Sequence, residues 1–165
     1  MSLHGLQLRA IPLEIPGGAN IIVGQSHFIK TVEDLYEALT TAVPQMKFGV
    51  AFNEASGPCL TRSDGNNAEL RAAAVKICTD VAAGHMFAIV MTDAFPINVL
   101  GAVKRVPEVV GVFCATANAV EVIVAETAQG RGILGVVDGV SPHGLENDEQ
   151  AATRHQFLRT IGYKR

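Results

Sequence analysis

Three apolar runs rich in β-branched residues follow one another late in the chain with no helix between them. They span residues 109–115, 120–125 and 133–137, and only short polar segments join them. Parallel strands need a crossover connection of a dozen or more residues, so these strands must pair largely antiparallel. The fold must therefore contain an antiparallel region.

Earlier in the chain, strand-like runs alternate with amphipathic helical stretches. The further strands expected are 6–15, 20–23, 48–52, 60–62 and 85–91, and the helices are 31–43, 67–82, 96–104 and 148–161. A hydrophobic content of 48% with 18% charged residues is typical of a well-buried globular fold, and 165 residues suit one domain. We therefore expect a single α/β domain over 1–165, with a mixed β-sheet flanked by helices.

Several local features are predicted as well. The turn at 16–18 predicts that the first two strands form a hairpin, and Ser63 to Asn66 reads as a polar turn. Thr31 followed by Asp34 resembles a capping box at the start of the first helix. The buried face predicted for the last helix consists of Phe157, Leu158 and Ile161.

Composition excludes several classes of partner. A net charge of −3 and a pI near 5.9 provide no electrostatic footprint for nucleic acid or anionic lipid. The apolar runs are too short to span a membrane, and residues 1–9 lack the apolar core of a secretory signal. Cys59, Cys78 and Cys114 are odd in number and widely spaced, which indicates reduced thiols. We expect a cytoplasmic protein with no nucleic-acid or membrane partner.

The polar segment 24–30 lies between a buried strand and a helix, and it carries His27 and Lys30. Ligand sites in α/β domains tend to lie at strand ends. His27 has three possible roles: a structural imidazole, a general base, or a nucleophile that accepts a phosphoryl group. Lys30 is a cation that would neutralise an incoming phosphate. His85, which follows Gly84 at the start of a strand, has the same alternatives, and the residues alone leave them open.

A glycine-rich segment at 130–135 matches the dinucleotide pattern G-x-G-x-x-G. That motif needs a helix after the glycines to hold a pyrophosphate, but here the sequence continues as a strand. The segment is therefore interpreted as a hairpin turn. Arg131 at its tip could still reach a phosphate. The phosphate-binding loop of ordinary kinases is absent from the sequence.

Carboxylates at strand ends form another candidate set: Glu54, Asp64, Asp93, Glu126 and Asp138. Transfer of phosphate from a nucleotide usually needs Mg²⁺, held by one or two carboxylates and by the phosphates themselves. The spacing of these residues does not specify such a site, and each of them alone could simply cap a turn.

Several stretches taken together closely resemble the adenosine-specific kinase family of small archaeal and bacterial proteins. They are GQSHFIKTVEDLY (24–36), FGVAFNEASG (48–57), RSDGN (62–66), AGH (83–85), PINVL (96–100), FCATAN (113–118) and 122–139. The resemblance runs from about residue 6 to Arg165, with one departure at Ala119, where the family is expected to have proline. It implies a three-layer α/β domain that forms homo-oligomers, either trimers or hexamers. It also implies a site for adenosine or AMP, phosphoryl transfer involving ATP, and a histidine able to hold phosphate.

These observations lead to a phosphotransferase hypothesis in which His27 attacks the γ-phosphate, with His85 as its rival. Lys30 and Arg131 would offset the negative charge of the transferred group. The residues expected at the site are His27, Lys30 and His85 for catalysis, and Glu54, Asp64, Asn118, Gly130, Arg131, Gly132 and Asp138 for the nucleotide. Asp64 or Asp138 would help hold Mg²⁺, Asn118 would bind the adenine edge or ribose, and Glu54 would bind a ribose hydroxyl or act as a base. The alternatives are a nucleotide-binding sensor or regulatory oligomer without turnover, and a purely structural oligomer.

Overall fold

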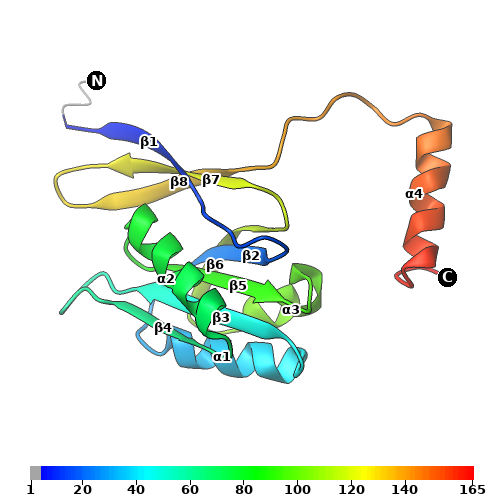
Figure 1. Cartoon of the computed structure of the whole chain (residues 1–165). Helices are drawn as coiled ribbons and strands as arrows, with labels where there is room; N and C mark the ends of the chain where they lie inside the picture. Colours follow the sequence, from blue (N-terminus) through cyan, green and yellow to red (C-terminus); the bar gives the residue numbers. More distant parts are fainter. Residues whose placement is uncertain (1–4) are drawn as a thin grey trace.

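A five-stranded antiparallel sheet forms the centre of the computed structural model, which describes residues 5–165 (Figure 1). Its strands are β2 (Asn20–Ser26), β3 (Lys47–Asn53), β4 (Thr61–Gly65), β5 (Met86–Thr92) and β6 (Val109–Thr116), in the order β4-β3-β5-β2-β6. The central strand β5 is apolar from Met86 to Met91, because both faces of the sheet are covered.

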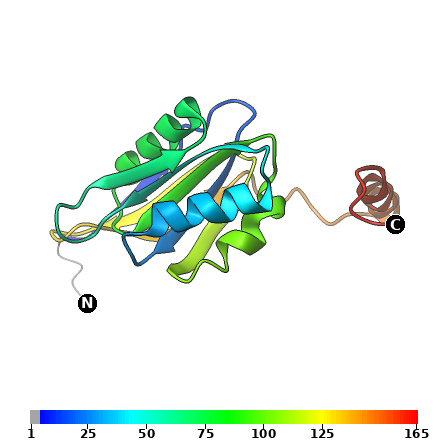
Figure 2. The same cartoon turned by 90° about the horizontal axis from the view of Figure 1, so that it is seen from below.

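A second antiparallel sheet and four helices complete the fold. The sheet contains β1 (Gln7–Pro12), β7 (Val120–Glu126) and β8 (Arg131–Asp138), in the order β1-β7-β8. The helices are α1 (Thr31–Ala42), α2 (Ala68–Val81), α3 (Pro96–Val103) and α4 (Asp148–Thr160). The small sheet and α2 cover one face of the central sheet, and α1 and α3 cover the other (Figures 1 and 2). This arrangement confirms a three-layer α/β fold.

Two hydrophobic cores lie on opposite faces of the central sheet, and successive residues of one strand alternate between them. Ile21 and Val23 of β2 join the core beneath α2 and the small sheet, whereas Ile22 joins the core beneath α1 and α3. All three side chains are fully buried. The alternation follows from the two-residue period of a β-strand.

Gly49 allows α2 to pack directly on the central sheet. A Cβ atom built on Gly49 would lie 2.2 Å from the backbone nitrogen of Arg71 and 2.3 Å from the carbonyl carbon of Leu70. The backbone of α2 therefore occupies the place where a side chain would project from β3, and only glycine leaves that space free.

The pairing predicted for the chain's first strands is wrong. β1 pairs with β7 along Gln7↔Glu126 to Pro12↔Glu121, while β2 pairs with β5 and β6. The reason is burial: β2 is apolar on both faces and takes an interior position, whereas β1 is exposed along most of its length and forms the edge of the small sheet. Likewise β6 and β7 belong to different sheets, and only β7 and β8 form the predicted antiparallel hairpin.

The predicted capping box of α1 is also wrong. Lys30 takes the N-cap position without a capping side-chain bond. Thr31 is buried, and its hydroxyl forms a hydrogen bond of 2.7 Å with the Ser26 hydroxyl. Asp34 instead forms an ion pair with Lys30. The polar turn predicted at Ser63 and Asp64 is part of β4, an edge strand whose residues are all half-buried.

Helix α4 stands apart from the three layers, at the end of the extended segment 139–147 (Figures 1 and 2). Asn147 and Gln150 form a capping box at its start. The predicted buried face is wrong for this chain, because Phe157 is 58% exposed, Ile161 is 44% exposed, and Leu158 is only half-buried. No helix within residues 5–165 has the length and apolar character needed to cross a membrane.

Replacing Gly49 with alanine should lower the free energy of unfolding by about 1–3 kcal/mol, because β3 and α2 must move apart to admit the methyl group. Gly135→Ala is the matched control, since it places a methyl group in a strand with nothing within 4 Å, and it should change stability by less than about 0.5 kcal/mol. Urea unfolding of both variants measures the difference. Equal stabilities would contradict the close approach of α2.

Candidate functional site

Five chain segments meet at one end of the central sheet, because its strands are antiparallel. The His85 amide donates to the Asn53 carbonyl over 2.8 Å, and the Ser26 amide donates to the His85 carbonyl over 2.9 Å. The His27 amide donates to the Glu108 carbonyl over 3.1 Å. We call this region the polar end of the sheet: the ends of β2 and β3, the starts of β4, β5 and β6, and the turns attached to them. It brings the segments of both predicted histidines side by side.

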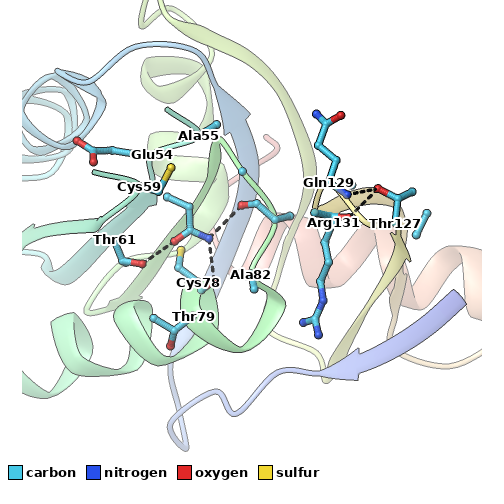
Figure 3. Close-up of a pocket in the computed structure, with 16 residues that line it drawn as sticks. Glu54, Ala55, Cys59, Thr61, Cys78, Thr79, Ala82, Thr127, Gln129 and Arg131 are labelled. Carbon is cyan, nitrogen blue, oxygen red and sulfur yellow. Dashed lines mark hydrogen bonds between the residues drawn. The ribbon is translucent and has the colours of Figure 1, made fainter. Parts of the chain in front are cut away.

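The Asn53 side chain fixes this end. It is buried, and its amide nitrogen donates to the carbonyls of Cys78 (2.8 Å) and Ala83 (3.0 Å). Its oxygen accepts a hydrogen bond of 2.8 Å from the Thr61 hydroxyl. One carboxamide thus joins β3, β4, the last turn of α2 and the segment that leads to β5 (Figure 3).

The short segment before β5 is held in a strained conformation. Ala82 and His85 have φ angles of +54° and +62°, in the left-handed region that favours glycine. The imidazole of His85 is half-buried and stacks on Phe52, with ring centroids 5.8 Å apart and planes at 12°. Strain of this kind persists where the surrounding contacts fix it and is concentrated at functional sites.

A cleft of about 800 Å³ opens between this segment and the β7–β8 hairpin (Figure 3). Its lining consists of Asn53, Glu54, Ala55, Cys59, Thr61, Cys78, Thr79, Ala82, Ala83, Gly84, Ala125, Thr127, Gln129, Gly130, Arg131 and Gly132. The volume lies within the range of about 300–1,000 Å³ that is usual for small-molecule sites. The predicted residues Glu54, Gly130, Arg131 and Gly132 therefore share one cavity.

Glu54 is already engaged by groups from β4 and its approach. Its carboxylate accepts hydrogen bonds from the Leu60 amide (2.9 Å) and from Nε of Arg62 (2.8 Å). The Leu60 amide, and after it the Arg62 guanidinium, hold the pKa of Glu54 below its usual value. An ionised carboxylate of low pKa can accept a hydrogen bond from a hydroxyl group but is a poor general base.

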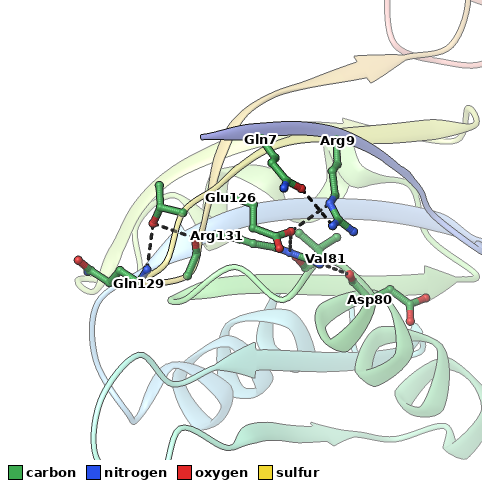
Figure 4. Close-up of polar contacts among 9 residues, drawn as sticks. Gln7, Arg9, Asp80, Val81, Glu126, Gln129 and Arg131 are labelled. Atoms are coloured by element: carbon green, nitrogen blue, oxygen red, sulfur yellow. Dashed lines mark hydrogen bonds and ion pairs between the residues drawn. The ribbon is translucent and has the colours of Figure 1, made fainter. Parts of the chain in front are cut away.

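Arg131 links the small sheet to the end of α2 (Figure 4). Its Nε lies 2.9 Å from the Glu126 carboxylate, and its Nη1 donates to the carbonyls of Asp80 (3.1 Å) and Val81 (3.2 Å). Arg9 of β1 forms a second ion pair with Glu126 at 3.1 Å. A cation at a helix C-terminus is favourable because the last carbonyls carry partial negative charge. Arg131 therefore has a clear structural role at the wall of the cleft.

Glu108, which sequence reasoning missed, is a buried carboxylate at the polar end. It is 2% exposed, and among residues 5–165 neither of its carboxylate oxygens has a hydrogen-bond partner. The nearest counter-charge is Nζ of Lys30, 3.5 Å from Oε2. The hydrogen bond with Asp34, followed by the charges of Asp34 and Glu108, raises the pKa of Lys30. The available signal was a lone glutamate between apolar residues just before a strand.

The remaining predicted residues lie elsewhere. Asp64 lies in β4 beside a separate hollow of about 250 Å³, which Ile29 and Glu33 also line. Asn118 and Asp138 are joined by a hydrogen bond of 3.0 Å at the opposite end of β8 from Arg131. An eight-residue strand spans roughly 25 Å, so one chain does not bring this pair to the cleft. Roles for these three residues in nucleotide binding stay predictions.

Metal binding has limited support in the described chain. Residues 5–165 contain no group of three or more His, Cys, Asp or Glu side chains that could hold a metal ion. A magnesium ion at this site would have to be held mainly by the phosphates of a nucleotide.

The comparisons with known proteins agree with the sequence resemblance. The family model described as adenosine specific kinase matches residues 11–164, and the chain belongs to that family. A solved structure with the same fold is the crystal structure of the PH1918 protein from Pyrococcus horikoshii OT3. It is 46% identical in sequence, with a TM-score of 0.93 over 97% of this chain and 99% of that chain. No protein of curated function matches the chain.

We predict that a thiol reagent labels only Cys59 in the native protein at pH 8. Cys59 is exposed, whereas burial raises the pKa of Cys78 to about 12 and that of Cys114 to about 11, so both stay protonated and inaccessible. Titration with a chromogenic disulfide should release one equivalent of coloured thiolate per chain from the folded protein, and three equivalents after unfolding in guanidinium. Rapid release of a second equivalent from folded protein would contradict the burial of Cys78 and Cys114.

Proposed function

We propose that this chain transfers the γ-phosphoryl group of ATP to adenosine at the polar end of the sheet. The observation that carries this proposal is that the segments of His27 and His85 are hydrogen-bonded neighbours at this end of the sheet, next to a cleft of nucleoside size that Gly84 lines. His27, Lys30 and His85 are not themselves among the residues that line the cleft. The family description supports the kinase activity and the adenosine substrate. The resemblance noted in the sequence further supports a cytoplasmic homo-oligomer, either a trimer or a hexamer.

The cleft suits the nucleoside part of the substrate. Glu54 has a low pKa and two fixed donors, so it serves as an acceptor for a ribose hydroxyl better than as a base. Gly130 and Gly132 leave the hairpin backbone open to a ligand, because nothing outside their chain neighbours lies within 4 Å of a Cβ atom built on either residue. Arg131 fixes this wall through the end of α2.

The exposed segment with His27 suits the phosphate. In the proposed step an imidazole nitrogen of His27 attacks the γ-phosphorus, and the bond from phosphorus to the β,γ-bridging oxygen breaks to release ADP. The adenosine hydroxyl oxygen then attacks phosphorus, the N–P bond breaks, and the hydroxyl proton passes to solvent. Lys30 offsets the negative charge in both steps. ATP enters with its own Mg²⁺.

The histidine step is tested by assaying transfer from γ-labelled ATP to adenosine with three variants. His27→Ala should lower the rate at least about 100-fold and abolish acid-labile label on the protein. His85→Gly tests the rival; glycine is chosen because φ at this position is +62°, which alanine would adopt with strain. His155→Ala on the exposed helix α4 is the control and should keep full activity.

Three outcomes of this assay separate the hypotheses. If His85→Gly loses the acid-labile phosphoryl label on the protein and His27→Ala keeps it, His85 is the residue that carries the phosphoryl group. Wild-type protein that shows no transfer but binds adenosine, with slower labelling of Cys59 in the cleft, would favour a sensor or regulatory oligomer. The low pKa of Glu54 favours this sensor alternative, because it leaves the cleft without a good general base for turnover. A lack of both transfer and binding would leave only the structural role.

We also propose that Glu108 positions Lys30 for the phosphate. A buried carboxylate without hydrogen bonds is costly to retain, and within residues 5–165 its one counter-charge is the Lys30 ammonium group at 3.5 Å. Glu108→Gln removes that charge but keeps the shape. It should raise KM for ATP about 5- to 10-fold, leave kcat within about twofold, and leave the melting temperature equal or higher.

Steady-state kinetics and thermal melting check the role of Glu108, with Glu33→Gln on the exposed face of α1 as the matched control. Glu108→Asp should recover part of the affinity for ATP. A lower melting temperature with unchanged KM would assign Glu108 to folding alone.

A further inference from the structure

Helix α4 lacks the packing that a helix of its length needs. It has thirteen residues, and none of them is buried. Isolated helices shorter than about 12–15 residues are only marginally stable in water, and most helices in proteins are stabilised by packing of an apolar face. A second surface must therefore cover α4 if it is to persist.

The uncovered face of α4 is apolar and its end is basic. Phe157 and Ile161 lie four residues apart on one face, and Tyr163, which follows, is 48% exposed. The last twelve residues of the chain carry four cations and no carboxylate: Arg154, Arg159, Lys164 and Arg165. The body over residues 1–138 has the opposite balance, with thirteen carboxylates against nine cations.

The small sheet has an uncovered apolar face of its own. Its inner face packs in the core through Val120, Val122 and Val124. On its outer face Leu8 is 67% exposed, and Val137, paired with the exposed Glu121, is 47% exposed. Leu134, at the register shift of β8, is 63% exposed. No element within residues 5–165 lies over this outer face in Figure 1.

The connection to α4 leads away from this outer face. Residues 139–147 leave the end of β8 as an extended segment, and Figures 1 and 2 show α4 beyond the side of the body. The chain therefore presents a helix that needs a covering surface and a sheet face that needs a covering layer, and it does not join them to each other.

We propose that α4 is an exchanged arm that covers the outer face of the β1-β7-β8 sheet in a second copy of this chain. A helix packed on that face adds a fourth layer and buries Phe157 and Ile161 against Leu8, Leu134 and Val137. The basic end of the arm then meets an acidic body. The inference rests on the uncovered surfaces alone and is independent of the proposed phosphoryl transfer.

Disulfide formation between two separately purified chains tests the exchange. One chain carries Leu134→Cys and the other Phe157→Cys, both with Cys59→Ser so that only buried native thiols remain. Oxidation of the mixture should give a covalent dimer containing one copy of each chain, identified by mass. Replacing the first variant by Glu37→Cys on α1, which lies on the opposite layer, should give at least tenfold less dimer.

A single chain that carries both cysteines distinguishes exchange from folding back. If α4 covered the sheet of its own chain, oxidation would give an internally bridged monomer at high dilution and no mixed dimer, and the proposal would be wrong. Equal dimer yields with Leu134→Cys and Glu37→Cys would also overturn it.

A second measurement uses trypsin, which cleaves after Arg154 and Arg159. Phe157→Asp with Ile161→Asp should release the arm, so that cleavage at these arginines becomes at least about tenfold faster than in the wild type. The control Gln156→Asp changes an exposed polar residue of the same helix and should leave the cleavage rate nearly unchanged. Equal rates in wild type and double variant would mean that the apolar face is not covered.

Discussion

The buried carboxamide of Asn53 is the interaction on which the polar end of this fold depends. Its three hydrogen bonds use both amide protons and the oxygen, and they join segments that are far apart in the sequence. A buried amide left without these partners costs about 1–3 kcal/mol for each group, so the arrangement is nearly all-or-none. The strained segment from Ala82 to His85 is held at both ends, because Asn53 bonds the carbonyl of Cys78 in the last turn of α2 and that of Ala83 within the segment, and the His85 amide bonds the Asn53 carbonyl.

Sequence patterns predicted the elements well and their partners poorly. Apolar runs and helical periodicity identified the strands and helices, because burial on one or two faces leaves a local signal. Pairing is non-local: β1 and β2 look like a hairpin, yet they belong to different sheets because only β2 is apolar on both faces. Alternation can show that a strand is half-buried, but it cannot show which sheet supplies the covering layer.

The candidate site follows the same division. His27 and His85 were identifiable because each stands beside a buried strand, and the structure brings their segments together through the carbonyl of His85. Arg131 and Glu54 were predicted from their charge. The sequence could not show that Arg131 bonds Glu126 and the end of α2, or that Glu54 accepts hydrogen bonds from Leu60 and Arg62. Glu108 was missed because its environment comes from β2 and α1, which are remote in sequence.

The two charged groups that face each other at the polar end differ sharply in exposure. Glu108 is 2% exposed, whereas the Lys30 side chain is 48% exposed and also pairs with Asp34. A buried carboxylate loses far more hydration than one exposed ammonium group can replace at 3.5 Å. Lys30, in contrast, can leave this pair at little cost because water and Asp34 remain available to it. The asymmetry makes the lysine the movable member of the pair, while Glu108 stays fixed in the fold as a negative charge that attracts the ammonium group to the polar end of the sheet.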